Sequence, residues 1–373
     1  MDLKALIFNH AKNIPGWRTK RKIVVFSVDD YGNVRLDSKK ARSSLDKNGL
    51  KPYSMFDTHD TLESRDDLYA LYDVLSSVKD KSGSHAIFTP FALSCNLNFE
   101  KMQEEGFKQV YVENLPKTYE KLATIYPKVY NQSWEAWEEG IKIGILSPQY
   151  HSREHFNFTT IQNRLNVQDF ELLTVLKNRT LTNLSSKNDE TPYTIALGYQ
   201  SFAENTMLSK IIEDGIKQFE VVFGNKPSCF MPPSATMSPV HHDKLSSLGI
   251  KAVDTAKYKK YQYSDLKYRK EFRWTGKQIK GIPTKFIVRN CVFEPLQQPK
   301  SLNICKQMIA AAFNMNKPAI ISSHRINFVG SIDESTRTRS MQELKELLKW
   351  IVLIYPDVEF LSLSALVNEM AVE

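Results

Sequence analysis

The apolar positions of this chain fall into two kinds of segment. Residues 22–30 form a nearly continuous run rich in β-branched side chains, which is typical of a strand buried on both faces. Comparable short runs occur at 85–90, 144–148, 229–233, 250–253, 318–324 and 358–361. Residues 64–78 and 340–354 instead repeat their apolar side chains every three or four positions, as amphipathic helices do. Because such strands alternate with helices from end to end, the pattern predicts an α/β fold with a mainly parallel sheet.

Residues of functional character recur where these apolar runs end. They are Asp29, Asp30, His151, Pro232, Pro233 and His324. In a (β/α) barrel, residues at the C-terminal ends of different strands meet on one face and build the active site there. We therefore predict a distorted (β/α) barrel of about seven parallel strands, with surface insertions and with the site on that face.

The rest of the chain is assigned around this barrel. Residues 1–22 form a basic N-terminal arm, and residues 23–373 are predicted to form a single domain with insertions around 98–140 and 255–285. The second insertion is rich in Lys, Tyr and Arg, so we expect one or two surface hairpins there. No apolar run approaches the ~20 residues of a membrane-spanning helix, and the arm lacks a signal-peptide core. We therefore expect a cytoplasmic protein without a membrane span.

Composition narrows the choice of partners. Apolar residues make up 42% and charged residues 25% of the chain, as in an ordinary folded protein. The net charge of +8 accompanies no helix-turn-helix, zinc-finger or RNA-binding signature, so no nucleic-acid partner is expected. The positive charge belongs either to a solvated face or to a cleft that favours an anionic sugar or a phosphate-bearing substrate. The four cysteines lie far apart, which indicates reduced thiols rather than a disulfide framework.

Three residues at or just after strand ends have the character of metal ligands. His151 and His155 are four residues apart, a spacing that places both imidazoles on one side of a helical turn. Asp30 adds a carboxylate, and three such ligands leave positions open for water and substrate, as in catalytic zinc sites. Either half of this set also occurs by chance on a helix surface or at a strand end. Together they predict that Asp30, His151 and His155 bind one divalent ion, Zn²⁺ or another transition metal.

Asp29 and His324 are the candidate acid–base groups. In an aspartate pair that leaves a strand the two side chains diverge, so one can bind metal while its neighbour stays free to act as a base. His324 ends a late strand, and an imidazole with its ordinary pKa near ~6.5 suits proton transfer at neutral pH. The alternative roles are a loop cap for Asp29 and a structural core histidine for His324.

Four motifs stand in a recognisable order along the chain. They are Ser27-Val-Asp-Asp-Tyr-Gly, His151-Ser-Arg-Glu-His, Phe230-Met-Pro-Pro and Ile321-Ser-Ser-His. In type and order they resemble the polysaccharide deacetylase family, also called the NodB-homology group or carbohydrate esterase family four. The chain is similar to a divergent branch, because Tyr31 is inserted before Gly32 and Met231 stands where the family has an arginine that pairs with the base. The family's tryptophan-bearing fourth motif is not recognisable near Asp254.

The resemblance implies a metal-dependent hydrolase that removes N- or O-acetyl groups from a sugar, a glycan or a glycan precursor. It implies Asp30, His151 and His155 as metal ligands, Asp29 as general base and His324 as general acid. Substrate contacts are expected at Tyr31, Arg153, Pro232, Arg289 and Arg325. Arg153, Arg289 and Arg325 are also the candidates to supply the charge missing at Met231. Two other functions stay open: hydrolysis of another non-peptide C–N bond on the same barrel, and glycan binding by a catalytically inactive protein.

Overall fold

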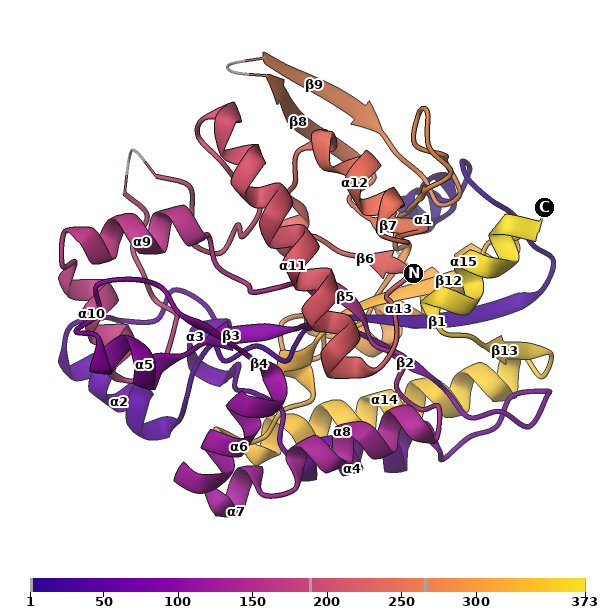
Figure 1. Ribbon diagram of the computed structural model, residues 1–373. Coiled ribbons are helices and arrows are strands. Elements are labelled where there is room, and N and C mark those ends of the chain that lie inside the picture. The colour runs from indigo at the N-terminus through magenta and orange to yellow at the C-terminus, as the bar shows by residue number, and fades with distance from the viewer. Residues whose placement is uncertain (1–2, 188–189, 265–266, 373) are drawn as a thin grey trace.

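A curled parallel β-sheet forms the centre of the molecule (Figure 1). The computed structural model describes residues 3–187, 190–264 and 267–372. In this part of the chain nine strands form one sheet, in the order β10-β7-β6-β5-β2-β1-β12-β11, with β13 paired to the first residues of β1. The strands are β1 (Lys22–Tyr31), β2 (Phe88–Leu93), β5 (Gln149–Ser152), β6 (Cys229–Phe230), β7 (Ala252–Asp254), β10 (Lys285–Ile287), β11 (Cys291–Val292), β12 (Ala319–His324) and β13 (Val358–Phe360).

The two edges of this sheet belong to one stretch of chain. Only residues 288–290 separate β10 from β11, so the chain pairs first with β7 and then with β12. All pairings in the sheet are parallel. The sheet therefore curls into a distorted barrel, in which β10 and β11 share one position of a seven-position ring. This confirms the expected α/β barrel fold.

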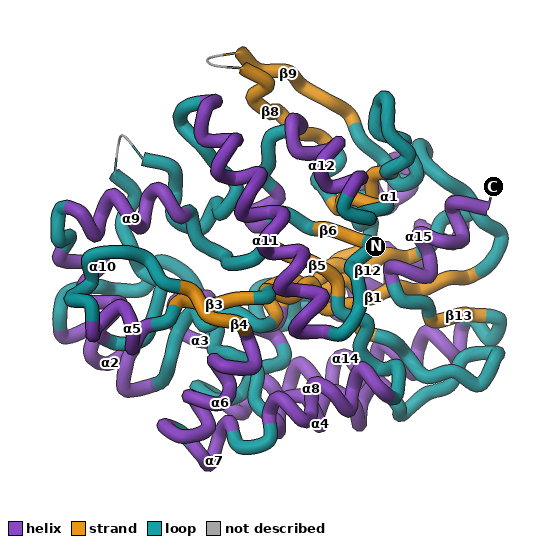
Figure 2. The backbone as a smooth tube through the Cα atoms, in the orientation of Figure 1, coloured by secondary structure: helices purple, strands orange, loops and turns teal. Residues whose placement is uncertain are grey.

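Helices surround the sheet on its outside (Figure 2). α4, α8 and α14 pack together along one flank, and α11 lies across β5 on another (Figure 1). None of the helices in the described residues combines the length and the apolar character needed to cross a membrane. The helices are α1 (Leu3–Ala11), α2 (Lys39–Lys47), α3 (Phe56–His59), α4 (Arg65–Leu75), α5 (Phe99–Glu104), α6 (Leu115–Ile125), α7 (Pro127–Tyr130), α8 (Ser133–Lys142), α9 (Phe158–Asn166), α10 (Phe170–Lys177), α11 (Asn205–Phe223), α12 (His242–Ser247), α13 (Ser301–Asn314), α14 (Glu334–Ile354) and α15 (Leu363–Val372).

The inner face of the barrel is apolar toward the start of its strands. One buried cluster takes Val25 from β1, Phe91 from β2 and Ile320 from β12, together with apolar residues of β6, β7, β10 and α15. Because side chains alternate between the two faces of a strand, Asp29 shares the inner face with Val25. The polar residues thus follow a packed apolar layer and lie at the C-terminal ends of the strands.

The second strand differs from the sequence expectation. Pro90 was expected to end it, yet β2 continues to Leu93. Pro90 pairs with Val28, and the register between β1 and β2 shifts directly after that pair. A proline has no N–H for the ladder, so it is tolerated where the partner strand bulges.

The predicted arm and insertions have defined structures. Within the arm, α1 packs against α13, and the Trp17 N–H donates to the Thr275 carbonyl at 2.8 Å. The segment around 98–140 contains α5 to α8 and closes a small antiparallel pair, β3 (Cys95–Leu97) with β4 (Val112–Asn114). The segment around 255–285 contains the antiparallel hairpin of β8 (Tyr258–Ser264) and β9 (Lys267–Phe272).

Candidate metal centre

A bulge in β1 brings two adjacent carboxylates into one cavity. The pairing of β1 with β2 jumps from Val28↔Pro90 to Tyr31↔Ala92, so β1 holds one extra residue in this interval. Asp30 lies there with φ +73°, in the left-handed region that residues other than glycine rarely adopt. Neighbouring side chains of a regular strand point to opposite faces, but the bulge re-aims one of them. Asp29 and Asp30 therefore both line the same cavity.

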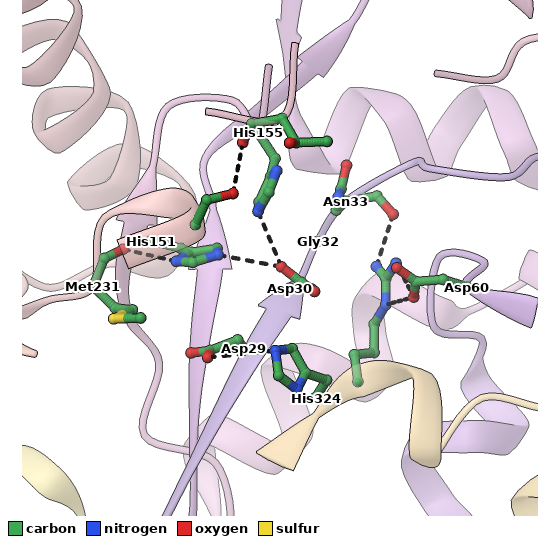
Figure 3. Close-up of polar contacts among 12 residues, drawn as sticks. Asp29, Asp30, Gly32, Asn33, Asp60, His151, His155, Met231 and His324 are labelled. Carbon is green, nitrogen blue, oxygen red and sulfur yellow. Dashed lines mark hydrogen bonds and ion pairs between the residues drawn. The ribbon is translucent and has the colours of Figure 1, made fainter. Parts of the chain in front are cut away.

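Asp30, His151 and His155 converge as the sequence predicted (Figure 3). Asp30 Oδ1 lies 3.3 Å from His151 Nε2 and 3.2 Å from His155 Nε2, and the three potential ligand atoms lie within 4.8 Å of one another. His151 Nδ1 lies 2.7 Å from the Met231 carbonyl oxygen, which leaves Nε2 free to face Asp30. Burial raises the pKa of Asp30, but hydrogen bonds from the two histidines outweigh burial and hold it well below its ordinary value. The donor set fits one divalent cation.

The local structure around the two histidines differs from the helical turn that their spacing predicted. His151 and His155 do not share a helical turn: His151 lies in β5, and His155 lies in the loop between β5 and α9. Pairing of β5 with β2 and β6 fixes the backbone around His151 as a strand. The chain then turns, which brings the two ring centroids to 5.2 Å. Histidines four residues apart thus converge on Asp30 through a strand and a turn.

Arg289 binds the second carboxylate. Its Nη1 and Nη2 donate to the two oxygens of Asp29, each at 2.7 Å, and its Nε donates to Asp254 Oδ2 at 2.6 Å. Burial raises the pKa of Asp254 to about 6, although the adjacent Arg289 charge lowers it. Among the three arginines considered for the charge missing at Met231, Arg289 is the one that reaches Asp29.

His324 lies on the other side of Asp29. Its Nε2 is 4.0 Å from Asp29 Oδ2, and its Nδ1 is 2.7 Å from Glu294 Oε1. Asn327 and Gln297 donate to the other Glu294 oxygen at 2.7 and 3.0 Å. Burial lowers the pKa of His324, but the hydrogen bond and charge of Glu294 outweigh burial, so the pKa rises to about 9.

Sequence reasoning did not find Glu294. It belongs to none of the four motifs and follows β11, a strand of two residues. The available signal was its position: an acidic side chain directly after the apolar run 291–293, where a barrel strand could end. Asp254 was noted only as the place where a family motif is missing, whereas the structure makes it a partner of Arg289.

Four of the expected substrate contacts lie away from the cavity. Tyr31 is buried with its ring edge-on to Trp137, at 5.7 Å between centroids. Arg325 is fully buried and pairs with Asp60 and Glu63 at 2.7 and 3.0 Å. These buried partners hold both side chains in the core, so neither faces a ligand.

Arg153 and Pro232 are also absent from the cavity lining. Arg153 pairs with Glu154 and Asp214, at 2.5 and 2.9 Å. Pro232 is not among the residues that line the cavity, although the neighbouring Met231 is. Of the five expected contacts, Arg289 alone lines the cavity, where it holds Asp29.

The cavity has a volume of about 690 Å³, within the range of small-molecule sites. Residues of the arm, such as Phe8 and Trp17, and Trp274 beside the hairpin complete its wall. Besides the histidines, its lining includes six lysines and arginines and three carboxylates: Lys12, Arg35, Lys257, Arg273, Arg289, Lys317, Asp29, Asp30 and Asp254. A ligand in it meets an excess of positive charge.

Comparisons with known proteins yield low similarity. No family model and no curated protein matches the chain. A solved structure assigned as a polysaccharide deacetylase from Pseudomonas aeruginosa PAO1 is 9% identical, with a TM-score of 0.49 over 95% of this chain and 92% of that one. A similar assignment from Mycobacterium smegmatis gives 11% identity and a TM-score of 0.46, over 96% and 93%. A GH57 branching enzyme from Thermococcus kodakaraensis gives 11% and 0.44, over 94% and 71%. Because these identities and TM-scores are low, a chemical assignment for this chain has to rest on the geometry of its site.

Proposed function

We propose that this protein is a metal-dependent hydrolase that removes acetyl groups from amide or ester positions of a sugar or glycan. One observation carries the proposal: Asp29 and His324, 4.0 Å apart, line the same cavity as Asp30, His151 and His155. A ligand set for a cation, a carboxylate base and an imidazole acid are the groups that hydrolysis of an acyl bond uses.

Asp29 is the base in this proposal. Asp30, His151 and His155 would hold a divalent ion, for which Zn²⁺ is our first choice, and that ion would supply Lewis acidity. Arg289 fixes the Asp29 carboxylate through both oxygens and leaves each oxygen a further lone pair. Asp29 is thereby oriented toward the cavity while it keeps the capacity to accept a proton.

His324 is the acid. Its Nδ1 faces Glu294, so its Nε2 faces the side of the cavity where Asp29 lies. A pKa of about 9 keeps the imidazole protonated at neutral pH, which is the state that a general acid needs. The Nε2 proton passes to the departing amine or alcohol.

The charge of the cavity indicates the kind of sugar. Its lysines and arginines outnumber its carboxylates by six to three before His324 or any metal is counted. A cleft of one charge sign concentrates ligands of the opposite sign. The preferred substrate is therefore an acetylated sugar that carries a phosphate or a carboxylate.

The test combines turnover with metal content. Acetate release is measured on paired neutral and phosphorylated N- and O-acetyl sugars, and bound metal is measured by elemental analysis. We expect turnover by the wild type, greater on the phosphorylated member of each pair, and its loss after chelation. His155→Ala should lose metal and activity together.

Asp29→Asn is the control that separates the two readouts. It should keep the metal, because Asp29 is not among the three ligands, and it should lose at least about 100-fold in turnover, because the base is gone. A His155→Ala protein with full metal content would refute the ligand assignment. A metal-loaded wild type inactive on every acetyl sugar would instead support an inactive glycan-binding protein.

A further inference from the structure

Helix α1 exposes apolar side chains and buries a polar one, which is the reverse of an ordinary surface helix. Its buried residue is Asn9, and Asn13 directly beyond it is also buried. Leu3, Ile7 and Phe8 point outward, and Ile7 and Phe8 are 60% and 66% exposed. A surface helix of a globular protein normally buries its apolar side. Grouped apolar side chains that remain exposed mark a surface that contacts something else.

The β8–β9 hairpin presents a second unusual surface. Directly paired residues of an antiparallel hairpin share a face, and here Tyr258 pairs with Phe272 and Lys260 with Lys270. Tyr268 lies on the same face, opposite Gln262. The three aromatic rings and both lysines are exposed, so one hairpin face is aromatic and basic.

Lys257 joins the two surfaces. Its Nζ donates to the Lys12 carbonyl at 3.0 Å, one residue beyond α1, and lies 5.3 Å from the centre of the Phe272 ring. Phe8 and Lys257 also line the same cavity. Figure 1 shows the hairpin at the top of the molecule and α1 below it to the right, with α9 and α10 at the left. We call this combined surface the basic–apolar face; it consists of Leu3, Ile7, Phe8, Tyr258, Lys260, Tyr268, Lys270 and Phe272.

We propose that the basic–apolar face docks on a lipid bilayer that carries anionic headgroups. Aliphatic side chains such as Leu3 and Ile7 gain by entering the acyl boundary, and tyrosines favour the interface above it. Lys260 and Lys270 have no acidic partner among the ion pairs of the described residues, and anionic headgroups complement them.

Other occupants fit this face less well. A sugar polymer stacks on aromatic rings, which leaves the aliphatic side chains of α1 unexplained. A symmetric dimer through the whole face would bury Lys260 and Lys270 of both copies, and the residues that define the face include no carboxylate to pair with them. The bilayer satisfies the apolar and the basic parts together.

Docking in this way has a consequence for the cavity. Phe8 belongs to the basic–apolar face and also lines the cavity wall. A bilayer seated on the face therefore lies next to the cavity, and ligands held at the lipid surface reach it without release into bulk solvent. This inference concerns docking and is independent of the reaction proposed above.

Vesicle co-sedimentation of the full chain tests the inference. Vesicles of phosphatidylglycerol and phosphatidylcholine should bind the wild type, pure phosphatidylcholine should bind it far less, and high salt should weaken the binding. Lys260→Glu with Lys270→Glu should reduce partitioning at least about 25-fold, since each basic residue near the surface contributes roughly fivefold. Leu3→Ser with Ile7→Ser should reduce it at least about tenfold.

The matched control is Val167→Ser with Phe170→Ser. These side chains are as exposed as those of α1 but lie at the ends of α9 and α10. This control should bind within twofold of the wild type, and circular dichroism should show all variants folded. No binding to anionic vesicles at low salt, or equal loss in the control, would overturn the inference. So would a wild-type dimer that Ile7→Ser dissociates, found together with no vesicle binding.

Discussion

Asp29 and Asp30 are neighbours in the chain and opposites in their surroundings. Asp30 faces two imidazoles, at 3.3 and 3.2 Å, and belongs to the triad that could hold a metal ion. Asp29 faces one guanidinium through two bonds of 2.7 Å and lies 4.0 Å from His324. The bulge at Asp30 makes this division possible, because it admits both side chains to one cavity with different partners.

The difference shows that residue type alone does not set the role of a carboxylate. Imidazoles are neutral ligands that share a cation with a carboxylate, whereas an arginine fork orients a carboxylate without taking all its lone pairs. Two identical side chains can therefore serve one reaction as ligand and as base. Environments that separate the behaviour of paired titratable groups are a general mark of acid–base sites.

Neutralising one carboxylate at a time should give the largest difference between Asp30 and Asp29. Asp30→Asn is expected to weaken metal binding at least about 100-fold, because loss of a ligand exceeds the 10–100-fold typical of a partner behind the ligands. Asp29→Asn should change metal affinity less than about tenfold. Isothermal titration with Zn²⁺ measures both, and equal losses would mean that the two carboxylates bind the ion together.

Removing the arginine should have the next largest effect. Arg289→Met leaves Asp29 and Asp254 buried without their cation, so the free energy of unfolding should fall by about 3–5 kcal/mol. Turnover should fall as well, while the metal stays bound. Denaturant unfolding and elemental analysis measure the two properties. A variant that loses its metal along with its activity would contradict a separate role for Arg289.

Asp254→Asn is the control for that substitution. It keeps an oxygen for Arg289 Nε, so its cost in folding stability should stay within about 1–2 kcal/mol.

The effect of Asp254 on folding stability should depend on pH with a defined sign. Burial raises the folded-state pKa of Asp254 to about 6, so its charge costs stability above pH 6, and the cost disappears as pH falls below the ordinary aspartate pKa. The stability of Asp254→Asn relative to the wild type should therefore be more favourable at pH 7 than at pH 4.

The smallest of these effects concerns His324, the proposed general acid. Glu294→Gln removes the charge that raises the pKa of His324, so the titration midpoint should drop from about 9 toward the ordinary histidine value. NMR titration of the metal-free protein measures it. His241, whose pKa burial lowers to about 4, serves as an internal reference in the same spectra. In the wild type His324 stays charged until pH rises through about 9. An unchanged midpoint in Glu294→Gln would leave the high pKa without its assigned cause.

The sequence was sufficient for the parts of the site encoded within short segments. Strand character followed from apolar runs, and the triad that could hold a metal followed from Asp30 and two histidines four residues apart. The left-handed backbone at Asp30 could not be anticipated, because it depends on how β1 pairs with β2 around Pro90. Arg289 lies 260 residues from Asp29, so only the folded barrel distinguishes it from the other candidate arginines.

Residues 285–292 pair with both edges of the sheet and also carry Arg289, so closure of the barrel and the orientation of Asp29 depend on the same stretch of chain. β1, β2 and β5 are neighbours in the sheet, so a chain with only these paired already gathers Asp30 and His151. Residues 285–292 complete the ring and place Arg289 beneath Asp29. Detaching residues 285–292 from the sheet would therefore remove Arg289 from Asp29, while β1, β2 and β5 would still hold Asp30 beside His151.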